Sequence, residues 1–98
     1  MSSRPAYIVV DARVSDPEGI MRYRELAALA VERYGGRYLV RGGEVQTLEG
    51  DWQPERLVIV RFDSIEIARR FYDSPEYRAA REARRVAAEF DMLLVDGV

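Results

Sequence analysis

The sequence predicts an α+β domain in which helices cover one face of a four-stranded antiparallel sheet. Three observations lead to this class. Runs rich in β-branched residues, which are typical of strands, occur in four places, at residues 6–14, 37–48, 56–62 and 90–95. Helical apolar spacing occupies the long segments between the first and second runs and between the third and fourth. Several strands are apolar on both faces, and two helical regions can cover only one of them.

The first strand is expected at Ala6–Val14, with the sequence AYIVVDARV. Successive side chains of a strand point to opposite faces. One face therefore carries Ala6, Ile8, Val10 and Ala12, and the other carries Tyr7, Val9, Asp11 and Arg13. Because both faces hold apolar residues, we expect this strand to lie in the middle of the sheet.

The first helix is expected to begin near residues 15–18 and to run to about Tyr34. Asp16 can cap its N-terminus, and Pro17 suits the first turn. Three-and-four spacing predicts a buried stripe that includes Ile20, Tyr23, Ala27, Ala30 and Val31. The pair Gly35-Gly36 is expected to end the helix, with one glycine in the left-handed conformation.

Residues 34–62 predict a long β-hairpin that organises the sheet. Its first strand is expected from Arg37 to about Leu48, with a bulge or bend at Gly42-Gly43. Residues 49–54 would form the connecting loop. The returning strand is expected at Arg56–Phe62, with Leu57 and Ile59 on one face and Val58, Val60 and Phe62 on the other.

The second helical region is expected to break at Ser74-Pro75. Ser64 can cap its first part, and Ser74 followed by Pro75 predicts a new start that continues to about Glu89. The last strand is expected at Phe90–Val95. The order is therefore β-α-β-β-α-β, and right-handed crossovers turn this order into the ferredoxin-like arrangement.

The length of 98 residues predicts a single domain over residues 1–98, with its core at roughly 6–95. The sheet face that bears Val9, Leu57 and Ile59 would form a large exposed apolar patch if it stayed bare. A second copy packed sheet against sheet would cover it. We therefore expect a homodimer through the open sheet face.

Composition excludes several kinds of chemistry. The chain has no Cys and no His, and all 15 of its basic residues are Arg, so the usual zinc, haem and Schiff-base sites lose their ligands. We expect no metal and no cofactor. The mixed charges sum to −2, which argues against nucleic-acid or membrane binding driven by charge. No apolar run reaches a membrane span and no signal peptide is visible, so a cytoplasmic protein is expected.

Several segments together resemble domain-of-unknown-function family 1330. They are YIVVDARV, the Asp16-Pro17 helix start, YGGRYLVRGGEV, the LEG loop, RLVIVRF and FYDSPEYRAAR. The likeness covers roughly residues 6–95. It implies ferredoxin-like subunits joined through their sheets, as in the dimeric α/β-barrel group. The family has no established activity, so the resemblance implies a fold and no catalytic residue.

Aromatic side chains supply the first group of candidate ligand-binding residues, Tyr23, Trp52, Tyr72 and Tyr77. Two interpretations stay open for them. Amphipathic rings at a helix–sheet boundary often serve packing alone, with each hydroxyl paired. The same rings could instead surround a flat organic ligand in a pocket between helices and sheet.

Two arginines complete the candidate site. Arg41 lies beside Gly42-Gly43, where a ligand can come close, and its guanidinium could bind a carboxylate in two places. Arg81 could turn inward from an otherwise solvated helical face. Both could instead form ion pairs, Arg41 with Glu44 or Glu49 among others. Asp11 and Arg61 are expected to pair with each other across the central strands.

Two functions remain open at this stage. The first is a homodimeric protein that binds a small aromatic or acidic organic molecule between helices and sheet. The second is a cofactor-independent oxygenase or isomerase of the dimeric α/β-barrel type, whose chemistry would rest on Tyr, Arg, Asp or Glu. RNA binding is disfavoured, because the strand RLVIVRF lacks the stacking aromatics of RNA-recognition domains.

Overall fold

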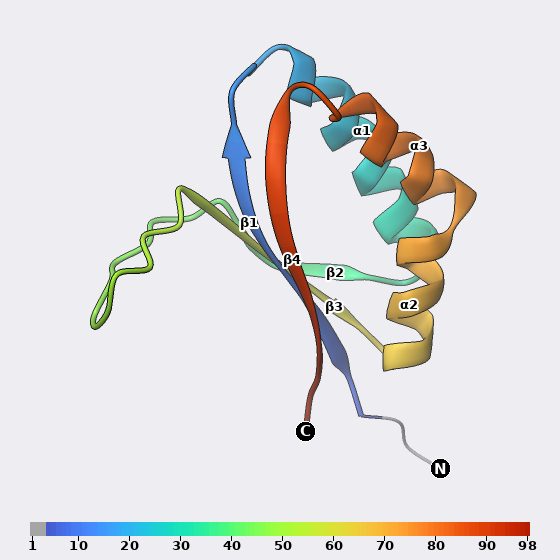
Figure 1. Ribbon diagram of the computed structural model, residues 1–98. Coiled ribbons are helices and arrows are strands. Elements are labelled where there is room, and N and C mark those ends of the chain that lie inside the picture. Colours follow the sequence, from blue (N-terminus) through green and yellow to red (C-terminus); the bar gives the residue numbers. More distant parts are fainter. Residues whose placement is uncertain (1–3) are drawn as a thin grey trace.

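The computed structural model describes residues 4–98, which form one sheet with helices packed on one face of it (Figure 1). The sheet is antiparallel, with the strand order β2-β3-β1-β4. This confirms the predicted ferredoxin-like order, with the second helical region divided in two. The elements are β1 (Ala6–Val14), α1 (Gly19–Arg33), β2 (Arg37–Arg41), β3 (Arg56–Phe62), α2 (Ile65–Asp73), α3 (Pro75–Ala83) and β4 (Ala88–Asp96).

The core lies between the helices and the inner face of the sheet. β1 pairs along its length with β3 and β4, so that Val10 lies opposite Val58 on one side and Met92 on the other. Aromatic rings pack together in this core. The ring centroid of Phe71 lies 4.9 Å from that of Phe62 and 4.6 Å from that of Tyr77. The predicted inner face of β1 is confirmed, since Ala6, Ile8, Val10 and Ala12 are all buried.

The ends of α1 agree with the sequence prediction only at the C-terminus. Gly35 adopts a left-handed φ of 71°, as expected for one glycine of the pair. The predicted cap by Asp16 is wrong. The N-cap residue is Glu18, which makes no side-chain capping bond, and only the backbone carbonyl of Asp16 takes part, accepting from Ile20 N–H at 3.1 Å. The helix begins at Gly19, two residues later than a cap by Asp16 requires.

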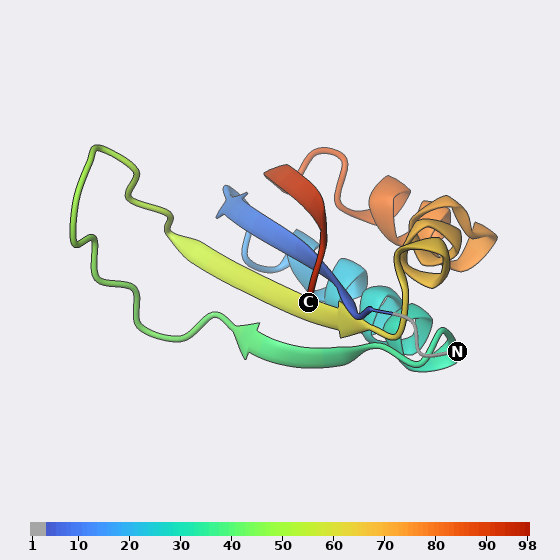
Figure 2. The same ribbon diagram turned by 90° about the horizontal axis from the view of Figure 1, so that it is seen from below.

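Strand β2 is shorter than predicted and its bulge lies elsewhere. It ends at Arg41, because Gly42 turns the chain with a φ of 75°. The register shifts between Tyr38 and Val40, not at the glycine pair. Residues 42–55 then form an irregular arm that projects from the sheet (Figures 1 and 2). The bulge matters for the site, since strict alternation would have sent Tyr38 and Arg41 to opposite faces.

Serine hydroxyls organise the second helical region. Ser64 accepts a hydrogen bond from Ile67 N–H at 3.2 Å, which confirms the predicted cap of α2. Ser74 is only 4% exposed, accepts from Tyr77 N–H at 3.1 Å and donates to the Phe71 carbonyl at 2.6 Å. One hydroxyl thus ends α2 and starts α3. α3 stops at Ala83 instead of near Glu89, because residues 84–87 turn to place Ala87 against Ile20.

None of the helices within residues 4–98 covers the outer face of the sheet (Figure 1). Leu39, Leu93 and Val95 are 54%, 63% and 45% exposed there.

The expected pair of Asp11 with Arg61 is wrong, because Asp11 lies opposite Leu57 in the register. Asp11 instead contacts Arg13 at 3.5 Å and accepts a hydrogen bond from Trp52 Nε1 of the arm at 3.0 Å, whereas Arg61 pairs with Asp63.

The helices described by the structure are all too short or too polar to cross a bilayer.

Gly36 allows the end of α1 to pack against the core, and its replacement tests this packing. A Cβ at Gly36 would lie 2.8 Å from Phe62 Cε1 and 2.9 Å from Val31 Cγ1, both in the core. We expect Gly36→Ala to lower the free energy of unfolding by about 1–3 kcal/mol, as overpacking does. Urea denaturation measures it. Gly43→Ala is the control, since no atom lies within 4 Å of its added methyl. Equal stability of both variants would contradict this packing.

Candidate functional site

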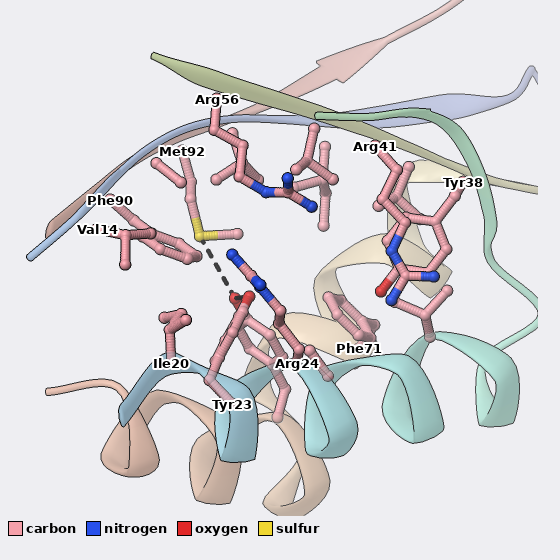
Figure 3. Close-up of a pocket in the computed structure, with 18 residues that line it drawn as sticks. Val14, Ile20, Tyr23, Arg24, Tyr38, Arg41, Arg56, Phe71, Phe90 and Met92 are labelled. Carbon is pink, nitrogen blue, oxygen red and sulfur yellow. Dashed lines mark hydrogen bonds between the residues drawn. The ribbon is translucent and has the colours of Figure 1, made fainter. Parts of the chain in front are cut away.

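A cavity opens between α1 and the inner face of the sheet (Figure 3). Its wall is largely apolar and includes Ile8, Val10, Ile20, Val58, Phe90 and Met92. The cavity offers about 60 Å³ to the centres of water-sized molecules. One water requires roughly 10–15 Å³ by this measure, so the space holds about four to six waters or a small organic group.

Two tyrosine hydroxyls meet in the cavity wall. Tyr23 of α1 and Tyr77 of α3 lie 2.7 Å apart, hydroxyl to hydroxyl, and their rings pack edge to face. The Tyr77 hydroxyl also lies 3.7 Å from the sulfur of Met92, and the Tyr23 ring packs edge to face against Phe90 with centroids 5.1 Å apart. These contacts hold the two hydroxyls between helix and sheet.

The tyrosine hydroxyls stay protonated near neutral pH. Burial raises the pKa of Tyr23 far above its ordinary value, and the neighbouring Tyr77 raises it further. Burial likewise raises the pKa of Tyr77, and that of Tyr38, where the positive charge of Arg41 partly offsets the rise. Neutral phenols donate hydrogen bonds, so these groups are suited to orient a bound oxygen and are poor general bases.

Three arginines reach the same cavity from three elements (Figure 3): Arg24 from α1, Arg41 from β2 and Arg56 from β3. The guanidinium of Arg41 lies over the Tyr38 ring, 4.1 Å from its centroid. Burial lowers the pKa of Arg56, and the positive charges of Arg24 and Arg41 lower it further. Arg56 therefore lies close enough to Arg24 and to Arg41 to be repelled by each.

Gly42 makes room for one of these arginines. The guanidinium of Arg56 lies directly against the Gly42 backbone, where any Cβ would overlap its Nη1 atom. The same glycine has the left-handed φ that ends β2, and its N–H donates to the Leu57 carbonyl at 2.9 Å. A glycine at this position thus serves both the turn and the side chain that crosses it.

The structure brings together half of the residues that the sequence singled out. Tyr23, Arg41 and Tyr77 line the cavity. Tyr72 and Arg81 lie outside this lining and pair with each other, with Arg81 Nη1 donating to the Tyr72 hydroxyl at 2.9 Å. Trp52 lies on the arm, bonded to the outer sheet face. Ligand binding by these six residues stays a prediction.

Sequence reasoning did not single out Arg24 or Arg56 as site residues. A signal for Arg24 was present in the spacing, because Arg24 lies on the helical face of the apolar stripe, four residues after Ile20 and three before Ala27. A charged residue in such a stripe often faces a cavity or a partner. Arg56 had no comparable signal, since it begins a strand beside the irregular arm and its direction depends on Gly42.

Within residues 4–98, no three acidic side chains gather closely enough to hold a metal ion.

The sheet order and the helices on one face define a ferredoxin-like protein, and solved structures share this fold. A protein of unknown function from Rhodopseudomonas palustris is 19% identical with a TM-score of 0.76, over 98% of this chain and 84% of that one. A dimeric ferredoxin-like protein of unknown function from Thermobifida fusca is 15% identical with a TM-score of 0.55, over 96% and 92%. A cofactor-independent oxygenase from Streptomyces nogalater is 12% identical with a TM-score of 0.56, over 98% and 95%. These likenesses concern the fold alone.

The family follows from the sequence. Residues 5–98 match the model of the family described as Domain of unknown function (DUF1330). The match spans nearly the whole chain, and the protein therefore belongs to this family. The resemblance inferred from the sequence motifs is confirmed. Among curated proteins, none matches the chain.

Alkaline pH tests the burial of the tyrosine pair. The folded pKa of Tyr23 is raised above the unfolded value of about 10, so the stability linked to its proton is complete below that pH and is lost as the pH rises above it. Each buried tyrosine of this kind should lower the free energy of unfolding by up to about 1.4 kcal/mol for each pH unit above that value. Because the chain has no Cys, His or Lys, few other side chains titrate there.

Urea denaturation between pH 8 and 11 measures this loss. We expect Tyr23→Phe to lose less stability over that range than the wild type does, whatever its stability at pH 8. Identical pH slopes for the wild type and Tyr23→Phe would contradict the buried position of the hydroxyl.

Proposed function

We propose that this protein is a small homodimeric binding protein that holds a small aromatic or acidic organic molecule in the cavity between α1 and the sheet. The observation that carries the proposal is the composition of the cavity wall, in which an apolar, aromatic surface meets a few convergent polar groups. Binding sites for small organic molecules commonly have this composition. A cavity that served packing alone would gain nothing from arginines directed toward it.

The candidate residues have distinct roles in this proposal. The rings of Tyr23 and Phe90 would pack against the flat part of the ligand. The hydroxyls of Tyr23 and Tyr77 would donate to a ligand oxygen, and Arg41 would bind its acidic group. Tyr72, Arg81 and Trp52 lie around the cavity and would act on the ligand only after a change of conformation or in the dimer.

The dimer is proposed to form through the outer sheet face. Apolar side chains exposed there in the single chain, such as Leu93 and Leu39, are the support from the structure. A structural neighbour with the same fold is described as dimeric, which gives further support. Each subunit would be a single domain spanning residues 1–98.

Catalysis by a cofactor-independent oxygenase or isomerase is the second candidate. The observation that favours it is the Tyr23–Tyr77 hydroxyl pair in the cavity wall, on a fold shared with a cofactor-independent oxygenase. The phenols would orient a substrate oxygen. Oxygen uptake with an aromatic polyphenol such as dithranol tests this candidate. Uptake by the wild type that falls at least about tenfold in Tyr23→Phe would support it, and no uptake above buffer would count against it.

Ligand binding can be tested with benzoate as the simplest aromatic acid. At ten times its dissociation constant, benzoate should stabilise the wild type by about 1.4 kcal/mol, because it binds only the folded protein. Differential scanning fluorimetry and calorimetric titration measure this effect. Ala27→Leu should abolish binding, since Ala27 lines the cavity.

Ala28→Leu is the matched control, because it makes the same change one residue along α1, outside the cavity lining. It should bind benzoate as the wild type does. Binding that survives Ala27→Leu unchanged would place the ligand elsewhere and contradict the proposed cavity.

Multi-angle light scattering tests the dimer. We expect the wild type to run at twice the chain mass of 11.3 kDa, and Ile59→Arg to shift it toward the monomer, since Ile59 lies on the outer face of β3. Leu48→Arg, at a 90% exposed position on the arm, is the control. Circular dichroism confirms folding of each variant. A wild type that stays monomeric at about 100 µM would contradict the proposed dimer.

A further inference from the structure

Positive charge gathers at the cavity although the chain as a whole carries a net charge of −2. Arg24, Arg41 and Arg56 line it, and its lining contains no acidic residue. Among residues 4–98, the ion pairs of the structure involve other arginines, and none joins these three to a carboxylate. The cavity thus holds three cations with no counter-charge from the described part of the chain.

The fold directs these three arginines to one cavity, although Arg24 and Arg41 stay exposed to solvent and Arg56 is half-buried. Arg41 stacks on Tyr38, and the β2 bulge places both residues on the cavity side. Arg56 crosses Gly42, whose missing Cβ leaves the space that its guanidinium occupies. Arg24 extends from the cavity side of α1 (Figure 3). Holding like charges close without a partner costs free energy, which a bound anion would recover.

We infer that the cavity selects an organic dianion, whose two acidic groups are held by Arg24, Arg41 and Arg56 while its flat body packs against Tyr23, Phe90 and Met92. The inference rests on the proposed binding function and specifies the charge of the ligand. A monoanion would leave two of the three positive charges uncompensated, whereas a dianion leaves one. Arginines on two neighbouring strands and on the facing helix can also bind two separate carboxylates, each in the planar two-point geometry.

The test compares isophthalate, a flat aromatic dianion, with benzoate, which has the same ring and one carboxylate. Calorimetric titration at about 20 mM salt limits screening. We expect the wild type to bind isophthalate at least about tenfold more tightly than benzoate. Arg24→Gln, Arg41→Gln and Arg56→Gln should each reduce this preference to within about threefold, because each removes one of the charges that the second carboxylate needs.

Matched controls are available on the same elements. Arg22→Gln on α1 and Arg37→Gln on β2 remove exposed arginines outside the cavity lining and should keep the preference for isophthalate. A second measurement needs no ligand. At low salt, Arg24→Gln should raise the melting temperature relative to Arg37→Gln, because it relieves the repulsion that Arg56 experiences at the cavity.

The outcomes separate the two proposals. If both acids bind with similar affinity and Ala27→Leu abolishes both, the preference for a dianion is wrong and the binding function stands. If isophthalate is preferred but the three arginine variants keep that preference, the assignment to these arginines is wrong. If neither acid binds, both proposals are overturned.

Discussion

The arrangement of this protein depends on β1, which is buried between β3 and β4 and presents apolar side chains to two sides at once. Its inward residues Ala6, Ile8, Val10 and Ala12 are each 4% exposed or less. Because the side chains of a strand alternate between two faces, Val9 and its neighbours point to the face that the helices do not cover, and another segment or subunit is needed to bury them. Right-handed crossovers place the helices on the same side, which leaves the outer face to the arm and, in our proposal, to a second subunit.

The cavity follows from the way α1 packs on this sheet. Small side chains such as Ala27 line the cavity together with the larger rings of Tyr23 and Phe71. The buried hydroxyls satisfy each other, as buried polar groups must. The guanidinium groups differ, because they approach the cavity without carboxylates beside them. In our proposal, this unequal satisfaction of polar groups makes the cavity a binding surface.

Much of the fold was predictable because its signals are local. The alternation in β1, the stop at Gly35 and the Ser64 and Ser74 caps are all confirmed. Errors occurred where a local signal had several structural solutions. Gly42 ends β2 instead of bulging it, and α1 begins too late for Asp16 to cap it. The site was predictable only in part, for Arg24 and Arg56 acquire their place through packing.

The sequence by itself determined the order of elements, the face that each strand residue takes in regular pairing, and the absence of Cys, His and Lys chemistry. Only the tertiary structure decided which polar side chains meet. Tyr23 and Tyr77 are 54 residues apart in the chain, and Arg41 joins Tyr38 because of one bulge. The physical reason is the distance along the chain over which each feature is decided. Strand alternation and helix caps depend on a few neighbouring residues, whereas the meeting of distant side chains at one cavity depends on register and packing across the whole sheet.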